Sequence, residues 1–217
     1  MKIALTGGIA CGKSLLSKFL NELGVETLDA DDVVHTLLPD PEERRRIAAE
    51  VFANPEKRKE LEARLHPIVK ERIDEWLSLS QNGSNAETQR SREAESLSGS
   101  GAQPQFSKPA PSAPLRLCVK NSVLKIAVIP LLFEAHWEKN FDIICCVASS
   151  RETQIERMIA TRGMSRAEAE ARLAAQLPVE EKARRSHYVI RNDGTADELR
   201  AEAQKLVAWL KTSTLQL

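Results

Sequence analysis

Short apolar runs alternate with amphipathic segments along most of the chain. Residues 3–6 (Ile-Ala-Leu-Thr) form an apolar run that leads through glycines into a helical pattern over 14–23. Gly24 ends that predicted helix, and a second extended run follows over 25–28. Helical spacing returns from Ala30 onward. The start of the chain therefore predicts strand, helix and strand in a parallel sheet, with a right-handed crossover.

The second half of the chain repeats this alternation. Unbroken apolar runs over 123–129 and 143–148 are typical of central parallel strands covered on both faces, and a last short strand is predicted over 188–190. Helices are predicted around them over 152–161, 166–176, 180–185 and 196–211. Together these elements predict an α/β fold of three layers, with helices on both faces of a parallel sheet.

Two stretches interrupt the rhythm. Residues 40–77 are charged, with apolar residues on recurring faces, and predict a helical subdomain. Residues 78 to about 114 are rich in Ser, Gly, Asn, Gln and Pro, which predicts a flexible insertion; a docking or regulatory segment is the alternative. Residues 115–119 fit either a strand that pairs with 123–129 or the frayed end of the insertion.

The composition suits one medium-sized domain. The 217 residues carry 31 basic and 31 acidic side chains, so no overall positive field favours nucleic acid or an anionic membrane. The aromatic content of 4% also disfavours a nucleic-acid binder. Every apolar run is shorter than the roughly 20 residues that cross a bilayer, and the N-terminus runs into a core strand rather than a signal peptide. The expected location is the cytoplasm.

The cysteines show neither zinc-ligand spacing nor a disulfide framework. They are Cys11, Cys118, Cys145 and Cys146. Cys145 and Cys146 lie in an apolar run and are predicted to be small hydrophobic residues of a buried strand. Cys11 lies just before a predicted helix, whose N-terminus can lower a thiol pKa. One hypothesis is that oxidation of Cys11 blocks nucleotide binding; a passive loop residue is the alternative.

The strongest motif lies between the first strand and the first helix. Residues 7–14 (Gly-Gly-Ile-Ala-Cys-Gly-Lys-Ser) fit G-x-x-x-x-G-K-[ST], the phosphate-binding P-loop. Inward-pointing N–H groups and the helix N-terminus would hold phosphate oxygens, Lys13 would bridge the outer two phosphates, and the Ser14 hydroxyl would bind Mg²⁺. The predicted ATP-binding residues here are Gly7, Gly8, Ile9, Ala10, Cys11, Gly12, Lys13, Ser14 and Leu15.

Carboxylates follow the second predicted strand, where the carboxyl ends of parallel strands open onto a ligand crevice. Strand alternation would place Asp29 and Asp31 on a common side if the backbone stays extended. One would then orient an acceptor hydroxyl and take its proton, while the other supports the water shell of a metal. A helix cap formed by Asp31 or Asp32 is the alternative.

Motifs spread over most of 1–77 and 123–210 occur in a fixed order. They are Leu5-Thr6-Gly7-Gly8-Ile9, Asp29-Ala30-Asp31, Leu65-His66-Pro67, Pro130-Leu131-Leu132-Phe133-Glu134, Gln154 with Arg157 and Arg162, Arg172 with Gln176, and residues 190–195. Together they resemble the dephospho-CoA kinase family. The resemblance implies phosphorylation of the 3′-hydroxyl of dephospho-CoA by ATP and Mg²⁺, the last step of coenzyme A synthesis, on a fold similar to nucleoside monophosphate kinases.

The resemblance also implies roles for single residues. Asp31 would be the catalytic base, with Lys13 and Arg157 as further catalytic residues, and Arg157 would belong to a mobile lid. Asn192 and Gly194 would lie beside adenine. The implied acceptor-binding residues are Asp29, Asp31, His66, Leu131 and Glu134. Ordinary roles compete with these: a solvated helix face for the arginines, a packed turn for His66 and a helix cap for Glu134.

The expected organisation is a single domain over 1–217. Its parts are a nucleotide-binding core (1–38, 123–150 and 186–212), a helical acceptor subdomain (39–77), a flexible insertion (78–120) and a lid region (151–185). The acceptor side departs from the family pattern, because residues 39–50 are shorter than usual and the insertion has no counterpart. Ala10 and Cys11 replace the usual Gly and Ser. Another small-molecule kinase or a non-catalytic nucleotide-binding regulator therefore remains an alternative, and a monomer is favoured.

Overall fold

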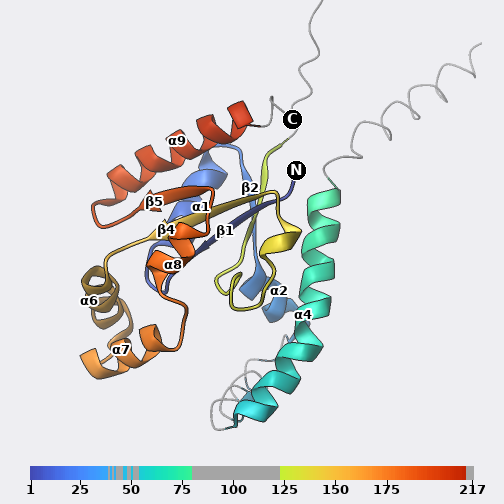
Figure 1. Cartoon of the computed structure of the whole chain (residues 1–217), viewed down its shortest axis with the longest axis vertical. Coiled ribbons are helices and arrows are strands. Elements are labelled where there is room, and N and C mark those ends of the chain that lie inside the picture. Colours follow the sequence, from blue (N-terminus) through green and yellow to red (C-terminus); the bar gives the residue numbers. More distant parts are fainter. Residues whose placement is uncertain are drawn as a thin grey trace, which may run out of the picture. The chain divides into compact units, whose positions relative to one another are not determined.

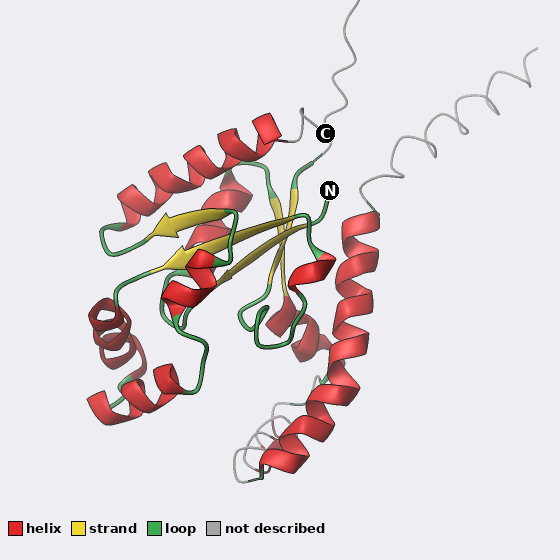
Figure 2. Ribbon diagram, in the orientation of Figure 1, coloured by secondary structure: helices red, strands yellow, loops and turns green. Residues whose placement is uncertain are grey.

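A five-stranded parallel sheet forms the centre of the computed structural model, which describes residues 1–38, 40, 42, 46–47, 50, 54–79 and 123–213. In chain order the strands are β1 (Ile3–Gly7), β2 (Glu26–Asp29), β3 (Lys125–Val128), β4 (Ile143–Ala148) and β5 (Tyr188–Arg191). Their order in the sheet is β2-β3-β1-β4-β5 (Figure 2). In the central register, Leu5 of β1 lies between Val128 of β3 and Cys145 of β4.

Helices follow the strands in the predicted alternation (Figure 1). They are α1 (Lys13–Glu22), α2 (Ala30–Leu37), α4 (Pro55–Ser78), α6 (Arg151–Arg162), α7 (Arg166–Ala174), α8 (Val179–Arg184) and α9 (Ala196–Ser213), with a 3₁₀ turn η1 (Glu138–Asn140). The predicted bounds agree within about two residues, the usual uncertainty of helix ends. Local capping explains this agreement: Ser150 caps α6, and Ser165 with Glu168 forms a capping box on α7.

Helices α1 and α9 cover one face of the sheet. Leu16 and Leu20 of α1 and Leu206 of α9 are fully buried in one cluster with Leu5 and Cys145. Because strand side chains alternate between faces, Ala4 points to the opposite face and joins a second cluster. The first layer and the sheet are therefore held together by one continuous apolar core.

Helices α2 and α4 cover the opposite face. Val33 of α2 and Val69 and Ile73 of α4 are buried against Ala127 and Ile144 of the sheet. The prediction of a three-layer α/β/α fold with a parallel sheet is thus confirmed.

The helical pattern predicted over 40–77 is present from Pro55 onward, and this excludes the alternative of a packed turn at His66. Helix α4 runs through both His66 and Pro67, from Pro55 to Ser78. A proline in a helix interior costs about 3 kcal/mol, since it removes a backbone N–H and crowds the preceding turn. The burial of Val69 and Ile73 beyond it stabilises the continued helix and offsets that cost.

Several predictions fall outside the described residues. These are most of the segment 39–53, the insertion apart from residues 78 and 79, the strand over 115–119, and Cys118. Within the described ranges, no helix is both long and apolar enough to cross a membrane.

Candidate active site

The loop between β1 and α1 requires glycine at two positions. Gly7 has φ 151° and its Cα faces the carbonyl oxygen of Val147 so closely that an added Cβ would overlap it. Gly12 has φ 91°, and an added Cβ would overlap the side-chain amide of Asn192. Both residues therefore let the chain curl against its neighbours in a conformation that other residues rarely adopt.

Ala10 lies in the left-handed region with φ 58°. This conformation costs an alanine about 1–2 kcal/mol. Contacts from α6 hold it in place: Nη1 of Arg157 donates to the Ala10 carbonyl (3.4 Å), and Ala10 packs on the cluster of Ile155 and Met158. The loop therefore keeps this backbone shape although alanine replaces the usual glycine.

Buried polar side chains gather around this loop. In the described ranges they are Thr6, Ser149, Gln154, Lys182 and Asn192. Nε2 of Gln154 donates to the Ile9 carbonyl (2.7 Å), and Nδ2 of Asn192 donates to the Cys11 carbonyl (2.8 Å). Burying such groups is unfavourable unless they are hydrogen-bonded, so their concentration here indicates that the loop is held in one defined shape.

The other buried polar groups complete this support. Ser149 Oγ donates to the Asn192 carbonyl (2.6 Å) and accepts from Arg157 (3.2 Å). Thr6 Oγ1 and Lys182 Nζ both donate to the Pro130 carbonyl, at 3.3 Å and 2.9 Å. Through Thr6 of β1 and Ser149 just after β4, these bonds support both the P-loop and the residues that begin at Pro130.

The Lys13 ammonium folds back onto the loop that precedes it. Nζ donates to the carbonyls of Gly8 (2.8 Å) and Gly7 (3.1 Å). Burial lowers the pKa of Lys13, and the charge of Lys182 adds to this effect, while the carboxylates of Asp29 and Asp31 oppose it. A poorly solvated ammonium with incomplete counter-charge favours an arriving phosphate.

The expectation of a lowered thiol pKa at Cys11 was wrong. Cys11 is 1% exposed, and burial raises its pKa, although the charge of Lys13 opposes the shift. Burial likewise raises the pKa of Cys145 and Cys146 to about 12, and both lie inside β4, which confirms them as buried hydrophobic residues. Loss of solvation outweighs the helix N-terminus at Cys11.

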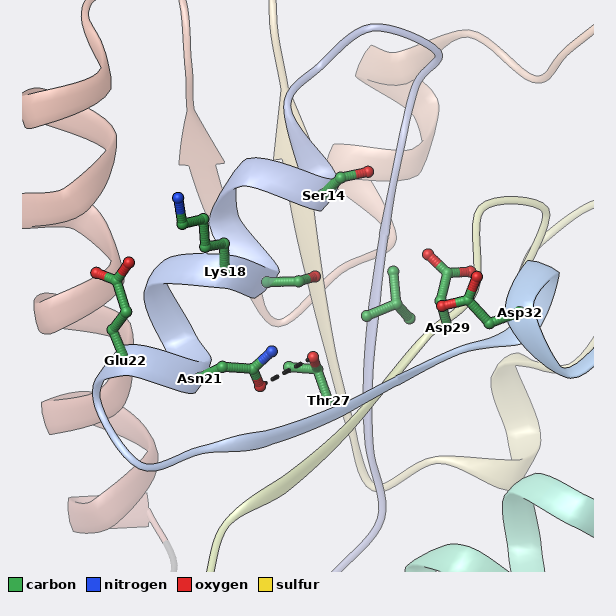
Figure 3. Close-up of a pocket in the computed structure, with 9 residues that line it drawn as sticks. Ser14, Lys18, Asn21, Glu22, Thr27, Asp29 and Asp32 are labelled. Carbon is green, nitrogen blue, oxygen red and sulfur yellow. Dashed lines mark hydrogen bonds between the residues drawn. The ribbon is translucent and has the colours of Figure 1, made fainter.

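A groove of about 770 Å³ runs beside α1 and past the end of β2. Figure 3 shows the Ser14 hydroxyl and the carboxylates of Asp29 and Asp32 toward one end of it, while Asn21 and Thr27 are hydrogen-bonded at the other. Burial raises the pKa of Asp29, and the bond that it accepts from the Asp31 backbone N–H (2.9 Å) opposes this shift. Asp29 is therefore the N-cap of α2.

Asp31 lies elsewhere, so the expectation that Asp29 and Asp31 share a side through strand alternation was wrong. The chain turns into α2 at Ala30, which places Asp31 in the first turn of a helix. Asp31 lines a second pocket of about 190 Å³ together with His66 and Leu131. The rest of that lining is apolar: Ala30, Val34, Leu61, Leu65, Val69, Ile129, Pro130, Ala135 and Trp137.

The structure thus brings three of the five predicted acceptor-binding residues around one pocket: Asp31, His66 and Leu131. Asp29 lines the groove instead, and Glu134 lines neither cavity, because it is bonded to Lys182. Trp137 was not predicted; its ring meets that of His66 edge to face at 5.3 Å. This contact joins residues far apart in sequence, and no local pattern signals it.

The remaining predicted residues surround the loop from two sides. Arg157 contacts the loop from α6, while Arg162 and Arg172 are exposed. The Asn192 side chain donates a hydrogen bond to the Cys11 carbonyl, and Gly194 lies in the turn before α9. The adenine contacts of Asn192 and Gly194 and the motion of a lid stay predictions.

The oxygen ligands at the groove suit Mg²⁺. Across the described residues, no group of three or more His, Cys, Asp or Glu side chains could hold a metal by itself. Mg²⁺ is usually bound by one or two protein oxygens together with substrate phosphates and water. Ser14 supplies such an oxygen at the start of α1, where the motif predicts the phosphates, and Asp29 and Asp32 at the start of α2 line the same groove.

Comparison with known proteins gives one family. A sequence model of the dephospho-CoA kinase family matches residues 1–43 and 115–198. A dephospho-CoA kinase of Synechococcus sp. (strain JA-3-3Ab) is 34% identical, and the alignment covers 94% of this chain and 90% of that protein. One from Geobacter sulfurreducens is 33% identical, with 96% and 97% covered. The family model leaves out 44–114, which contains His66 and most of the predicted insertion.

Solved structures show the same fold. Dephospho-CoA kinase from Campylobacter jejuni superposes with a TM-score of 0.62 at 22% identity, covering 99% of this chain and all of that one (100%). Shikimate kinase from Acinetobacter baumannii, solved with shikimate, gives a TM-score of 0.54 at 16% identity, with 99% and 94% covered. Small-molecule kinases therefore share this sheet and its helical layers.

Proposed function

Since this chain belongs to the dephospho-CoA kinase family, it is a kinase that phosphorylates dephospho-CoA with ATP, and we propose that Lys13, Asp31 and Ser14 carry the transfer to the ribose 3′-hydroxyl. The observation that carries this proposal is the position of Asp31. Asp31 lines the same pocket as His66 and Leu131, and its charge also acts on the pKa of Lys13 in the P-loop. An acceptor in that pocket would meet a base on one side and the phosphates on the other.

The shape and chemistry of this pocket favour the adenosine end of the acceptor. Its lining is mostly apolar, and Trp137 and His66 add two aromatic rings. A flat base is bound well by such surfaces. Because the ribose is joined to the base, a base in this pocket would bring the 3′-hydroxyl toward Asp31.

The proposed transfer needs one proton acceptor and one phosphate clamp. Asp31 takes the proton of the acceptor hydroxyl as its oxygen forms a bond to the γ-phosphorus, while the bond from that phosphorus to the β,γ-bridging oxygen breaks and ADP leaves. Lys13 exchanges the Gly7 and Gly8 carbonyls for phosphate oxygens. Arg157 lies beside the loop, where its guanidinium can stabilise charge on the transferred group.

Ser14 would hold Mg²⁺ directly, and Asp29 would support the water shell of the ion, which neutralises charge on the phosphates when bound. Asp29→Asn should keep the helix cap, because asparagine caps as well as aspartate, but should remove the negative charge. We expect the Mg²⁺ concentration for half-maximal rate to rise about tenfold. The measurement is the initial rate over a Mg²⁺ titration at saturating substrates.

The same variant has a signature in stability. Burial raises the pKa of Asp29, so the contribution of this carboxyl is present at low pH and is lost as pH rises through its folded-state pKa. Asp29→Asn should therefore gain melting temperature relative to the parent as pH rises from acidic to neutral without Mg²⁺. An unchanged Mg²⁺ requirement would rule out the metal-supporting role.

The function is tested by ADP release in a coupled assay. Dephospho-CoA should support turnover, whereas AMP, phosphopantetheine and a sample without acceptor should give only background. Mass spectrometry of the product should show one added phosphate on the ribose. Faster turnover of AMP than of dephospho-CoA would instead identify a nucleoside monophosphate kinase. Cytoplasmic location and a monomeric state remain predictions.

A further inference from the structure

Lys182 is a buried lysine that the transfer itself does not use. Its side chain is 0% exposed, although Glu180, Glu181 and Arg184 of the same helix are charged. Nζ lies 2.7 Å from Oε1 of Glu134 and donates to the Pro130 carbonyl at 2.9 Å. A fully buried ammonium cannot reach a substrate in this structure, so its role has to be sought in the residues that it joins.

Those residues belong to two walls of the site. Pro130 and its neighbour Leu131 line the proposed acceptor pocket. Glu134 Oε1 also accepts from the backbone N–H of Leu177 (3.0 Å), which lies between α7 and α8. Leu177 in turn lines a cavity of about 400 Å³ that opens beside Gly8 of the P-loop. The ion pair therefore links the edge of the acceptor pocket to the segment that flanks the phosphate loop.

The Lys182 ammonium is fully buried, the Glu134 side chain is 25% exposed, and the charge of Lys182 also acts on Lys13. Glu134 Oε2 is buried and has no hydrogen-bond partner in the described part of the chain. Removing one member of a buried pair leaves the other charge uncompensated, whereas removing both charges is often nearly neutral for stability. A buried pair of this kind adds little to stability and is better explained by the positions that it fixes.

We propose that Lys182 and Glu134 are positioning residues that hold the Pro130–Leu131 edge of the acceptor pocket at a fixed distance from the P-loop. Lys182 fixes Pro130 through its carbonyl, beside the hydroxyl of Thr6 in β1, and Glu134 fixes the other end of the same short segment to Leu177. The inference rests on the proposed function, because it assigns Pro130 and Leu131 to acceptor binding.

The test compares three variants with the parent chain. Lys182→Met keeps the length of the side chain and removes its charge. Lys182→Met with Glu134→Gln removes both charges, and the glutamine oxygen can still accept from Leu177. Arg185→Met is the matched control: Arg185 follows α8 directly, bonds to Glu138 (2.7 Å) and lies over the Phe133 ring (4.3 Å), but has no bond to Pro130 or Leu177 among the contacts described. KM for dephospho-CoA, KM for ATP, kcat and melting temperature are measured for each.

We expect Lys182→Met to lower the melting temperature and to raise KM for dephospho-CoA about tenfold, since a displacement of even 1 Å weakens productive binding strongly. KM for ATP should change less than about twofold. The double variant should regain most of the melting temperature but keep the raised KM for dephospho-CoA. Arg185→Met should leave both KM values unchanged.

Other outcomes overturn the proposal. If KM for dephospho-CoA returns to the parent value together with stability in the double variant, the pair is merely structural. An equal rise of both KM values would also contradict a role specific to the acceptor. If Lys182→Met does not fold, KM for dephospho-CoA is compared between the double variant and the parent. Turnover of dephospho-CoA by the parent is measured first, and its absence overturns the function and the inference together. If the parent turns over dephospho-CoA but the variants keep the parental KM values, the inference alone is overturned.

Discussion

Lys13→Met is expected to lower kcat/KM for ATP by about a thousandfold, the size of effect seen when one charged or hydrogen-bonding group is removed from a developing negative charge. Methionine keeps the buried stem of the side chain and removes the ammonium, which in this structure is bonded only to the carbonyls of Gly7 and Gly8 among the contacts described. The rate is measured with dephospho-CoA at saturation and ATP varied.

Stability should respond to Lys13→Met in the opposite direction. Burial lowers the pKa of Lys13, which means that the folded protein holds its charged form at a cost. The variant should therefore melt at the parent temperature or above it in the absence of nucleotide. ATP should raise the melting temperature of the parent but of the variant far less, because only a ligand that binds the folded state stabilises it.

The control for this variant is Lys205→Met. Lys205 is an exposed lysine of α9, paired with Glu202 one turn away and remote from the loop. Its replacement should leave both the rate and the ATP-dependent shift unchanged. Retention of more than about a tenth of the parental kcat/KM by Lys13→Met would contradict the role of Lys13 as the phosphate clamp.

Asp31→Asn is expected to lower kcat by about a hundredfold to ten-thousandfold, the range typical of a lost general base. Asparagine has the same shape but cannot take the proton of the acceptor hydroxyl. KM for ATP should stay close to the parental value, because Asp31 lines the acceptor pocket rather than the P-loop. Steady-state kinetics with each substrate varied in turn separate the two effects.

Asp197→Asn is the matched control for this second variant. Both aspartates stand in the first turn of a helix, where a carboxylate interacts favourably with the helix dipole. The two variants should therefore lose similar, small amounts of stability, of a few tenths of a kcal/mol. If Asp31→Asn slows turnover no more than Asp197→Asn does, Asp31 is not the base.

The sheet and the phosphate loop were predictable because their signals are local. Apolar runs mark β1 and β4, and the glycines at 7 and 12 sit where the backbone conformation and close contacts admit little else. Capping residues such as Ser165 set helix ends within the helix itself. Where one short segment contains its own physical cause, reading along the chain was sufficient.

The acceptor side was harder because its geometry depends on where the chain turns. Strand alternation failed for Asp29 and Asp31, since the Asp29 side chain caps α2 and the backbone coils immediately after it. The helical pattern around His66 was predictable, but Pro67 left a packed turn as an alternative, and the burial of Val69 and Ile73 on the sheet decides for the helix. A local cap therefore decides the position of Asp31, whereas a contact with the sheet decides that of His66.

Lys182 was missed although a weak signal existed. It lies three residues after Val179 and directly before Ala183, on the face of α8 that packs on Val189 and Cys146. A lysine on an apolar face is usually an exposed residue at its margin. Its partners, Pro130 and Glu134, lie about fifty residues earlier, and only the folded chain brings them together.

The order of the strands has a consequence for how the protein acquires its activity during synthesis. β2 pairs with β3, and β3 pairs with β1, so β3 at residues 125–128 separates two strands that both lie near the start of the chain. Long-range parallel pairing of this kind forms slowly. A nascent chain that has emerged only through α4 contains Lys13 and Asp31 but lacks the strand that spaces them. The P-loop and the acceptor side can therefore take up their final arrangement only after β3 has been synthesised, past the middle of the chain.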